Sequence, residues 1–237
     1  MQVQRWTIRV ATCAVFAATW MFRWLTFDIT NDHFVHLSRA RQILLGEIPV
    51  RDFFDPGLPL HYYASAAALA VFGQSLFGEA LLTVTFVALG AALTFYLAAP
   101  SSRSVAPGIL ATIVAVVMFP RLYNYPKVFL YPLALVCLWH YAARRTTLAL
   151  TALAGVTVVA LLFRFDHGLY IGVASAVGVV LANRDRGRSA PATLVRFAAI
   201  GAALVLPFVV FVQLTAGIGP YLGDAIGKGS SVAGARV

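Results

Sequence analysis

The chain has 237 residues, of which 60% are hydrophobic and 11% are charged, and its mean hydropathy is +0.82. Ordinary soluble domains carry about 25% charged and about 45–50% apolar residues, so the composition excludes a disordered protein and argues against a soluble globular enzyme. The formal net charge is +9, but the basic residues are scattered between apolar runs, where membrane proteins keep their topology signals. We therefore expect a protein embedded in a lipid bilayer, with no nucleic-acid partner.

Apolar runs recur along most of the chain, and several approach the roughly 20 residues that a membrane-spanning helix needs. They predict an all-α, polytopic transmembrane helix bundle of about seven spans within residues 1–216. Residues 217–237 form a Gly- and Ser-rich tail without an apolar run. The predicted spans are residues 8–27, 79–99, 108–119, 128–143, 148–163, 169–183 and 192–216.

The basic clusters set the expected orientation. Arg144 and Arg145 form one cluster and residues 184–188 form another, and such clusters remain in the cytoplasm. Counting spans from them gives a cytoplasmic N-terminus in a plasma (inner) membrane, with residues 28–78 outside. This count requires residues 58–73 to form a re-entrant or interfacial helix, because a true span there would give eight crossings.

The outer loop, residues 28–78, begins with the most polar stretch of the chain, residues 28–57, which holds five of the nine acidic residues. Asn31 or Thr30 is expected to cap a helix that Gly46 ends. An apolar stripe recurs along that helix at the spacing of one face. The stripe consists of Phe34, Leu37, Ala40 and Leu44, and the opposite face of Asp32, His36 and Arg39. The pattern predicts a helix lying at the membrane surface with a carboxylate at its N-terminal end.

The order and spacing of residues in this loop resemble those of the GT-C membrane glycosyltransferases, which include protein O-mannosyltransferases and lipid A aminoarabinose transferases. The resemblance covers about residues 5–100, and farther along the chain it extends to the Arg-Phe-Asp-His-Gly segment at 164–168. It implies that the chain corresponds to the N-terminal membrane module of such enzymes. The matching loop residues are Asp32, Gly46, Pro49, Arg51, Asp52, Phe53, Pro59, Leu60, Tyr62, Phe72 and Gly73.

The resemblance implies inverting transfer of a sugar from a polyprenyl-phosphate donor to an acceptor glycan, lipid or protein on the outer face. Such a reaction needs a carboxylate that accepts the acceptor's proton. Asp32 is the expected base, and Asp28 is the alternative, because the chain has Asn31-Asp32 where many members have an Asp-Glu pair. A solvated loop acid without a role is the competing interpretation of either residue.

The departing phosphate needs cations near the outer ends of the spans. Arginine and lysine are both suited to phosphate, although side chains at such positions also serve as interfacial anchors. The turn at residues 164–168 carries ionisable groups close to membrane depth, where they either pair with one another or line a cavity. The substrate-binding candidates are Arg51, Asp52, Arg121, Lys127, Arg164, Asp166 and His167.

Two further expectations concern metal binding. Asp52 and Asp55 together with Asp32 could hold a divalent metal, as in some relatives, although three acids without fixed geometry are a weak signal. His140, beside Trp139 in a predicted span, is expected to pack in the core rather than to bind a metal. No other metal site is predicted.

Two other function classes remain open at this stage. A transporter or flippase would use Arg164 and Asp166 as a substrate or proton path, but the chain lacks the repeated halves typical of transporters. A non-catalytic membrane scaffold would have no need for the acidic outer loop. The sugar, the lipid carrier and the acceptor are not encoded in any pattern of the sequence.

Overall fold

The structure is a computed structural model that describes residues 5–55, 57–102, 104–118, 120–184 and 189–223. In these ranges all regular secondary structure is helical, which confirms the expected all-α class. The elements in chain order are α1 (Arg5–Leu25), α2 (Asn31–Leu44), α3 (Pro59–Phe72), α4 (Leu76–Ser101), α5 (Val105–Val117), η1 (Leu122–Asn124), α6 (Tyr125–Arg144), α7 (Thr147–Phe163), α8 (Phe165–Arg184) and α9 (Ala190–Thr215).

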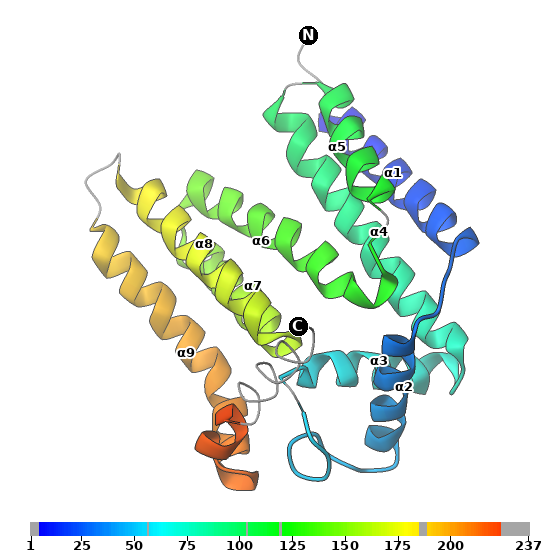
Figure 1. Ribbon diagram of the computed structural model, residues 1–237. Helices are drawn as coiled ribbons and strands as arrows, with labels where there is room; N and C mark the ends of the chain where they lie inside the picture. Colours follow the sequence, from blue (N-terminus) through cyan, green and yellow to red (C-terminus); the bar gives the residue numbers. More distant parts are fainter. Residues whose placement is uncertain (1–4, 56, 103, 119, 185–188, 224–237) are drawn as a thin grey trace, which may run out of the picture.

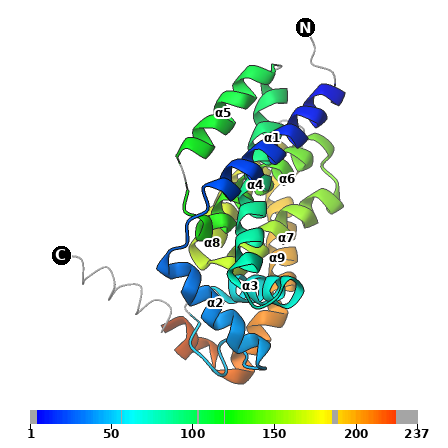
Figure 2. The same cartoon turned by 90° about the vertical axis from the view of Figure 1, so that its right-hand side faces the viewer.

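The long helices run alternately up and down in Figure 1. Helices α1, α4 and α5 form one group, α7, α8 and α9 form another, and α6 lies between the two groups. Both views place α2 and α3 together at the lower end, and Figure 2 shows α1 lying across α4. The C-terminal ends of α6 and α8 both lie at the upper end.

Four helices are long and apolar enough to cross a membrane, namely α1 from Trp6, α4, α8 and α9, and two shorter apolar helices are α5 and α7. Large apolar side chains on their surfaces stay exposed, among them Leu110 on α5, Leu181 on α8 and Leu214 on α9. Soluble proteins rarely expose apolar surface of this extent to water. These helices therefore indicate a membrane-embedded protein.

Small residues bring α4 and α6 into close contact. A Cβ atom added at Gly90 of α4 would lie 2.3 Å from the carbonyl oxygen of Val128 on α6, so only glycine permits this approach. Close backbone contact through small residues is how helices gain packing energy in lipid, where burial of apolar surface contributes little. Beside this crossing, Val84, Val87, Leu122 and Tyr125 form a buried cluster.

Residues 28–78 form two helices, and α2 buries most of its apolar stripe, because Leu37, Ala40 and Leu44 pack against α3. Two residues differ from the prediction: Phe34 of the stripe is exposed, and His36, expected on the opposite face, is buried beside His33. Ala40 packs on Ala66 and Leu69 of α3. At its ends α2 follows the sequence more closely, because Thr30 is the N-cap residue and Gly46 adopts a positive φ of 94° just after the helix.

Candidate functional site

A cavity of about 410 Å³ lies where α2 and α3 meet η1, the start of α6 and the junction of α7 and α8. Four separate stretches of sequence contribute to it, residues 32–36, 58–62, 123–127 and 163–167, so the fold assembles this site from residues far apart in the sequence. Four residues predicted from the sequence to be functional line it. They are Asp32, Lys127, Arg164 and His167, and they share the cavity with His36, His61, Tyr62, Tyr123, Asn124 and Phe163.

The carboxylate side of the cavity depends on two local structures. Asp32 lies in the first turn of α2, where a negative charge is favoured by the helix dipole, and it is exposed. The turn before α3 is fixed by Asp55, whose Oδ1 accepts hydrogen bonds from the backbone N–H groups of Gly57 (3.0 Å) and Leu58 (2.7 Å). Because that turn sets where α3 begins, it also positions His61 on the cavity wall.

Asp55 also joins the outer loop to the segment after α9. The hydroxyl of Tyr221 donates a hydrogen bond of 3.3 Å to Asp55 Oδ2, across 166 positions of sequence. Burial raises the pKa of the Asp55 carboxyl, and the three hydrogen bonds oppose that effect. The carboxylate thus has a structural role, and it does not line the cavity.

The cationic side of the cavity comes from α6 and from the junction of α7 and α8. Lys127 follows Pro126 in the first turn of α6, and its side chain is exposed. Arg164 is the C-cap residue of α7 in an extended conformation, and its Nε lies 2.9 Å from Asp166 Oδ1. Both side chains of this pair are part-exposed, so Arg164 remains able to contact a ligand while Asp166 orients it.

Gly168 makes the tight junction between α7 and α8 possible. A Cβ atom there would lie 2.3 Å from the Cα of Leu161, so a larger residue would push α8 away from α7. The junction sets the positions of Arg164 and His167 at the same time. His167 is further held by a 3.3 Å contact between its Nδ1 and the hydroxyl of Tyr131.

One wall of the cavity is a pair of stacked imidazole rings. The centroids of His36 and His61 are 3.8 Å apart, and the ring planes differ by 9°. Burial lowers the pKa of His36, and burial together with the neighbouring charges of His36, His33 and Arg164 lowers the pKa of His61 well below its ordinary value. The stack is therefore uncharged at neutral pH and presents a flat, weakly polar surface.

Behind this wall a buried pair connects α2 to α4. His33 Nδ1 lies 3.4 Å from Glu79 Oε1, and each side chain is only 1% exposed. Removing one partner from such a pair strands a charge in an apolar surrounding. The pair accounts for the burial of His33 on α2, beside the stripe residues that pack on α3.

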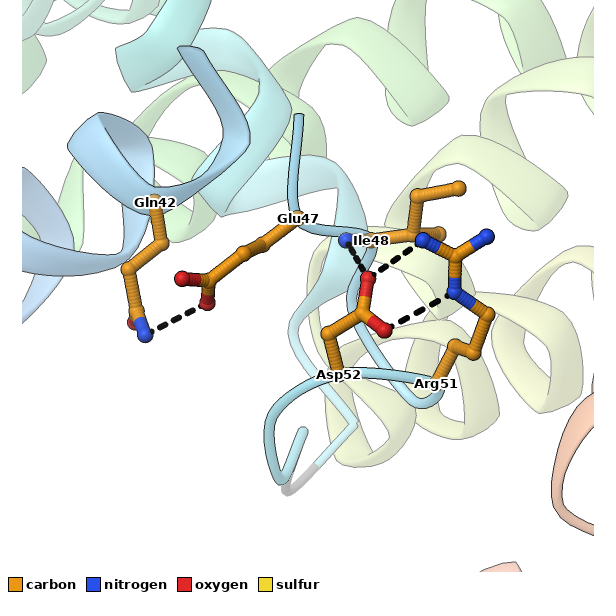
Figure 3. A network of polar contacts seen from close by, with 5 residues as sticks. All are labelled: Gln42, Glu47, Ile48, Arg51 and Asp52. Carbon is orange, nitrogen blue, oxygen red and sulfur yellow. Dashed lines mark hydrogen bonds and ion pairs between the residues drawn. The ribbon is translucent and has the colours of Figure 1, made fainter. Parts of the chain in front are cut away.

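Five predicted site residues are not among those that line the cavity, and one of them is Asp166, which contacts Arg164 as described above. Arg51 and Asp52 bind each other through hydrogen bonds of 2.9 Å and 2.6 Å, and Asp52 also accepts a bond of 2.7 Å from the backbone N–H of Ile48 (Figure 3). Arg121 is exposed, with Nη1 lying 3.5 Å from the hydroxyl of Tyr123. Asp28 is exposed on the linker between α1 and α2.

The carboxylates weighed as metal ligands do not fit a metal site. Asp52 is paired with Arg51 and Asp55 with the turn before α3, while Asp32 lies on the cavity. Within the described ranges no group of three His, Cys, Asp or Glu side chains is arranged to hold a metal ion. The expectation that His140 packs in the core is wrong, because it is exposed, with Nδ1 lying 2.9 Å from the carbonyl oxygen of Val136.

A second cavity, of about 440 Å³, adjoins the first. It lies between α4, α5 and α6, and it shares Asn124 and Lys127 with the first cavity. Its other lining residues are mostly apolar, including Val87, Ala91, Val116 and Met118, but Arg23 of α1 also lines it. Lys127 thus lies between the first cavity and this mostly apolar one.

Sequence reasoning did not assign a role to Glu79, His33 or His61. Glu79 could have been identified from the sequence, because an acidic residue at the start of a long apolar run needs a partner. Three of the five histidines fall in residues 28–78, and this concentration could have pointed to His33 and His61.

No family model matches the chain, and no match was found among the curated proteins or among the solved structures.

Proposed function

We propose that the chain is a membrane-embedded glycosyltransferase module of the GT-C type, which moves a sugar from a polyprenyl-phosphate donor to an acceptor at the outer membrane surface. One observation carries the proposal. Asp32 and the cations Lys127 and Arg164 line a single cavity, although they come from three different elements. A base opposite two phosphate-binding cations is the arrangement that this reaction requires.

In the proposed reaction, the acceptor's hydroxyl or amine attacks the anomeric carbon of the sugar. The bond between that carbon and the phosphate oxygen breaks, and the phosphate leaves with the electron pair. Asp32 accepts the proton of the acceptor. Lys127 and Arg164 hold the phosphate as its negative charge grows, and the pairing of Arg164 with Asp166 keeps the guanidinium oriented.

The donor's tail has a candidate place as well. The apolar cavity between α4, α5 and α6 begins at Lys127, so a phosphate on that lysine leaves the isoprenoid chain beside apolar side chains. The stacked rings of His36 and His61 and the ring of Tyr123 offer flat surfaces to the sugar.

The topology that goes with this function is also a proposal. The seven helices α1 and α4–α9 cross a plasma membrane, the N-terminus is cytoplasmic, and α2 and α3 lie at the outer surface. The alternation of these helices in Figure 1 supports an odd number of crossings. Both views place α3 beside α2 at one end of the bundle and not alongside the long helices, which supports a position at the membrane surface for α3.

The test is a transfer assay with the full chain in lipid nanodiscs. A panel of polyprenyl-phosphate hexoses and pentoses is offered with an extract of acceptors, and the release of polyprenyl phosphate is measured. We expect release from at least one donor, and a loss of about 100-fold in the Lys127→Ala/Arg164→Ala double variant. The control is Arg41→Ala, which removes an exposed cation of α2 that does not line the cavity.

Absence of release from every donor, with the protein folded, would contradict the proposed enzyme. Equal activity of the double variant and the wild type would contradict the phosphate site. Movement of an intact donor between leaflets, without cleavage, would instead indicate the flippase alternative.

A further inference from the structure

A third cavity, of about 490 Å³, lies at the opposite end of the molecule from the candidate active site. It is bounded by the first turns of α1, the last turns of α4 and the C-terminal half of α6. The residues that matter for its chemistry are Arg9, Tyr96, Trp139, His140 and Arg144, with Ile8 and Val136 as apolar neighbours. Figure 1 shows α6 diverging from α4 toward this end, so the cavity lies in the opening between them.

The length of α6 sets the distance between the two sites. Lys127 of the active-site cavity and Arg144 of this cavity are 17 positions apart on one helix, which corresponds to about 25 Å along its axis. That length approaches the thickness of the hydrocarbon core of a bilayer. The third cavity therefore lies near the other membrane surface, the one that the basic clusters predict to be cytoplasmic.

The charged side chains described at this end of the molecule are basic. Every acidic residue in the described ranges is located in the outer segments or at the outer ends of α4 and α8: Asp28, Asp32, Glu47, Asp52, Asp55, Glu79 and Asp166. Within those ranges neither Arg9 nor Arg144 has an ion pair with a carboxylate, and both side chains are exposed. Two guanidinium groups thus line one cavity without a carboxylate from the described part of the chain.

We propose that this cavity binds the phosphate group of an anionic phospholipid of the inner leaflet. Arg9 and Arg144 hold the phosphate, because guanidinium groups suit phosphate oxygens. Tyr96 and Trp139 supply further donors to the headgroup, and Trp139 is 40% exposed, as is usual for an aromatic side chain at a membrane interface. Ile8 and Val136 contact the start of the acyl chains.

The cavity takes a lipid rather than a soluble phosphate because of its position. It opens between helices whose surfaces are apolar, and Val10 of α1 and Leu135 of α6 are exposed close to it. The phosphate of a lipid pairs with the two arginines, and its acyl chains cover these apolar side chains at the same time. Polar headgroups also reach this depth without breaking their contact with water. The inference does not depend on the proposed glycosyl transfer.

The test compares the binding of two lipids to the full chain in detergent by native mass spectrometry. Phosphatidylglycerol and phosphatidylcholine with identical acyl chains are titrated, and the affinity of the first bound lipid is measured for each. We expect phosphatidylglycerol to bind at least about tenfold more tightly, and the Arg9→Ala/Arg144→Ala double variant to lose that preference. The Arg9→Lys/Arg144→Lys variant should keep most of the preference.

The matched control is the Arg184→Ala/Arg196→Ala double variant, which removes two exposed cations of α8 and α9 that do not line this cavity. It should keep the full preference for phosphatidylglycerol. An equal loss in this control would show general charge attraction and would overturn the site. Displacement of the lipid by an equal concentration of glycerol 3-phosphate would identify a soluble phosphate as the ligand, and that result would also overturn the proposal.

Discussion

Asp32 is the only carboxylate of the described chain among the residues that line the active-site cavity. We predict that Asp32→Asn lowers turnover about 100-fold or more, because the amide cannot accept the acceptor's proton, and an aligned general base contributes about that much. The side chain is exposed, so the thermal unfolding midpoint should fall only slightly, by the loss of the favourable interaction of the charge with the helix dipole. The measurement is the transfer assay described above, together with an unfolding curve for each variant.

Two variants separate a catalytic role from a general effect of charge in the outer loop. Glu47→Gln removes a carboxylate that accepts a 2.7 Å hydrogen bond from Gln42 (Figure 3) and does not line the cavity, and it should keep full activity. Asp28→Asn tests the alternative base. If Asp28→Asn abolishes transfer and Asp32→Asn does not, the assignment of Asp32 is wrong.

The stacked histidines make stability depend on pH. Burial lowers the pKa of His36 and His61 in the folded protein, whereas in the unfolded chain both titrate near their ordinary value of about 6.5. As pH falls through that value, the unfolded state binds protons that the folded state does not bind. Stability should therefore decrease as pH falls from 7.5 toward 5, and it should not change from this source above pH 7.5.

This pH dependence is measured as the thermal unfolding midpoint in detergent. His61→Phe should reduce the fall in the midpoint between pH 7.5 and 5, because phenylalanine keeps the stacking surface and removes one titrating group. His140→Phe, which replaces an exposed histidine, should leave the pH dependence unchanged. A fall of the same size in His61→Phe would assign the dependence to His33, Glu79 or other groups around the cavity.

At the same scale, the sequence predicted part of the cavity and could not predict the rest. Lys127, Arg164 and His167 were identified as candidates because each is an ionisable residue near an expected span end, and Asp32 because it is the carboxylate in the first turn of the predicted loop helix. Arg51 is also an ionisable residue near an expected span end, but it forms an ion pair with its neighbour Asp52 instead of facing the cavity. Whether a charge pairs with its neighbour or faces a cavity depends on the backbone of the loop, which no spacing rule specifies.

At the scale of the elements, the junction of α7 and α8 has a stringent steric requirement. We predict that Gly168→Ala destabilises the protein by about 2 kcal/mol, because the added methyl group would overlap the backbone of Leu161. The change should also lower transfer, since Arg164 and His167 move with the junction. Gly155→Ala in α7 is the control, because no atom lies within 4 Å of the Cβ position there; it should be neutral or slightly stabilising.

Helix positions were easier to predict than helix faces. Apolar runs marked the long helices to within a few residues, because hydropathy reports length and composition directly. The face of α2 was predicted in part, since Leu37, Ala40 and Leu44 of the stripe pack against α3, whereas Phe34 is exposed and His36 is buried. The differences have a tertiary cause, because His36 stacks on His61 of α3 and the neighbouring His33 contacts Glu79 of α4.

At the scale of the whole molecule, the described acidic residues gather at the end where α2 and α3 lie, whereas basic residues lie at both ends. Lys127 and Arg164 lie at the acidic end, and the basic ends of α6 and α8 lie at the other. The position of the basic clusters between apolar runs follows from the sequence. The cavity formed by four stretches of sequence does not follow, because it requires the packing of α2 and α3 against the other helices.

The orientation gives the last prediction. In a background with Cys13 and Cys137 replaced by alanine, a cysteine at exposed Ser38 of α2 should react with an impermeant maleimide added to intact cells. A cysteine at exposed Ser189, before α9, should react only after the membrane is opened. Both sites are outside helix–helix contacts, so differences in labelling report the side of the membrane and not burial. If Ser189→Cys is labelled in intact cells and Ser38→Cys is not, the orientation is inverted, the active-site cavity opens to the cytoplasm, and the donor must be presented on that side.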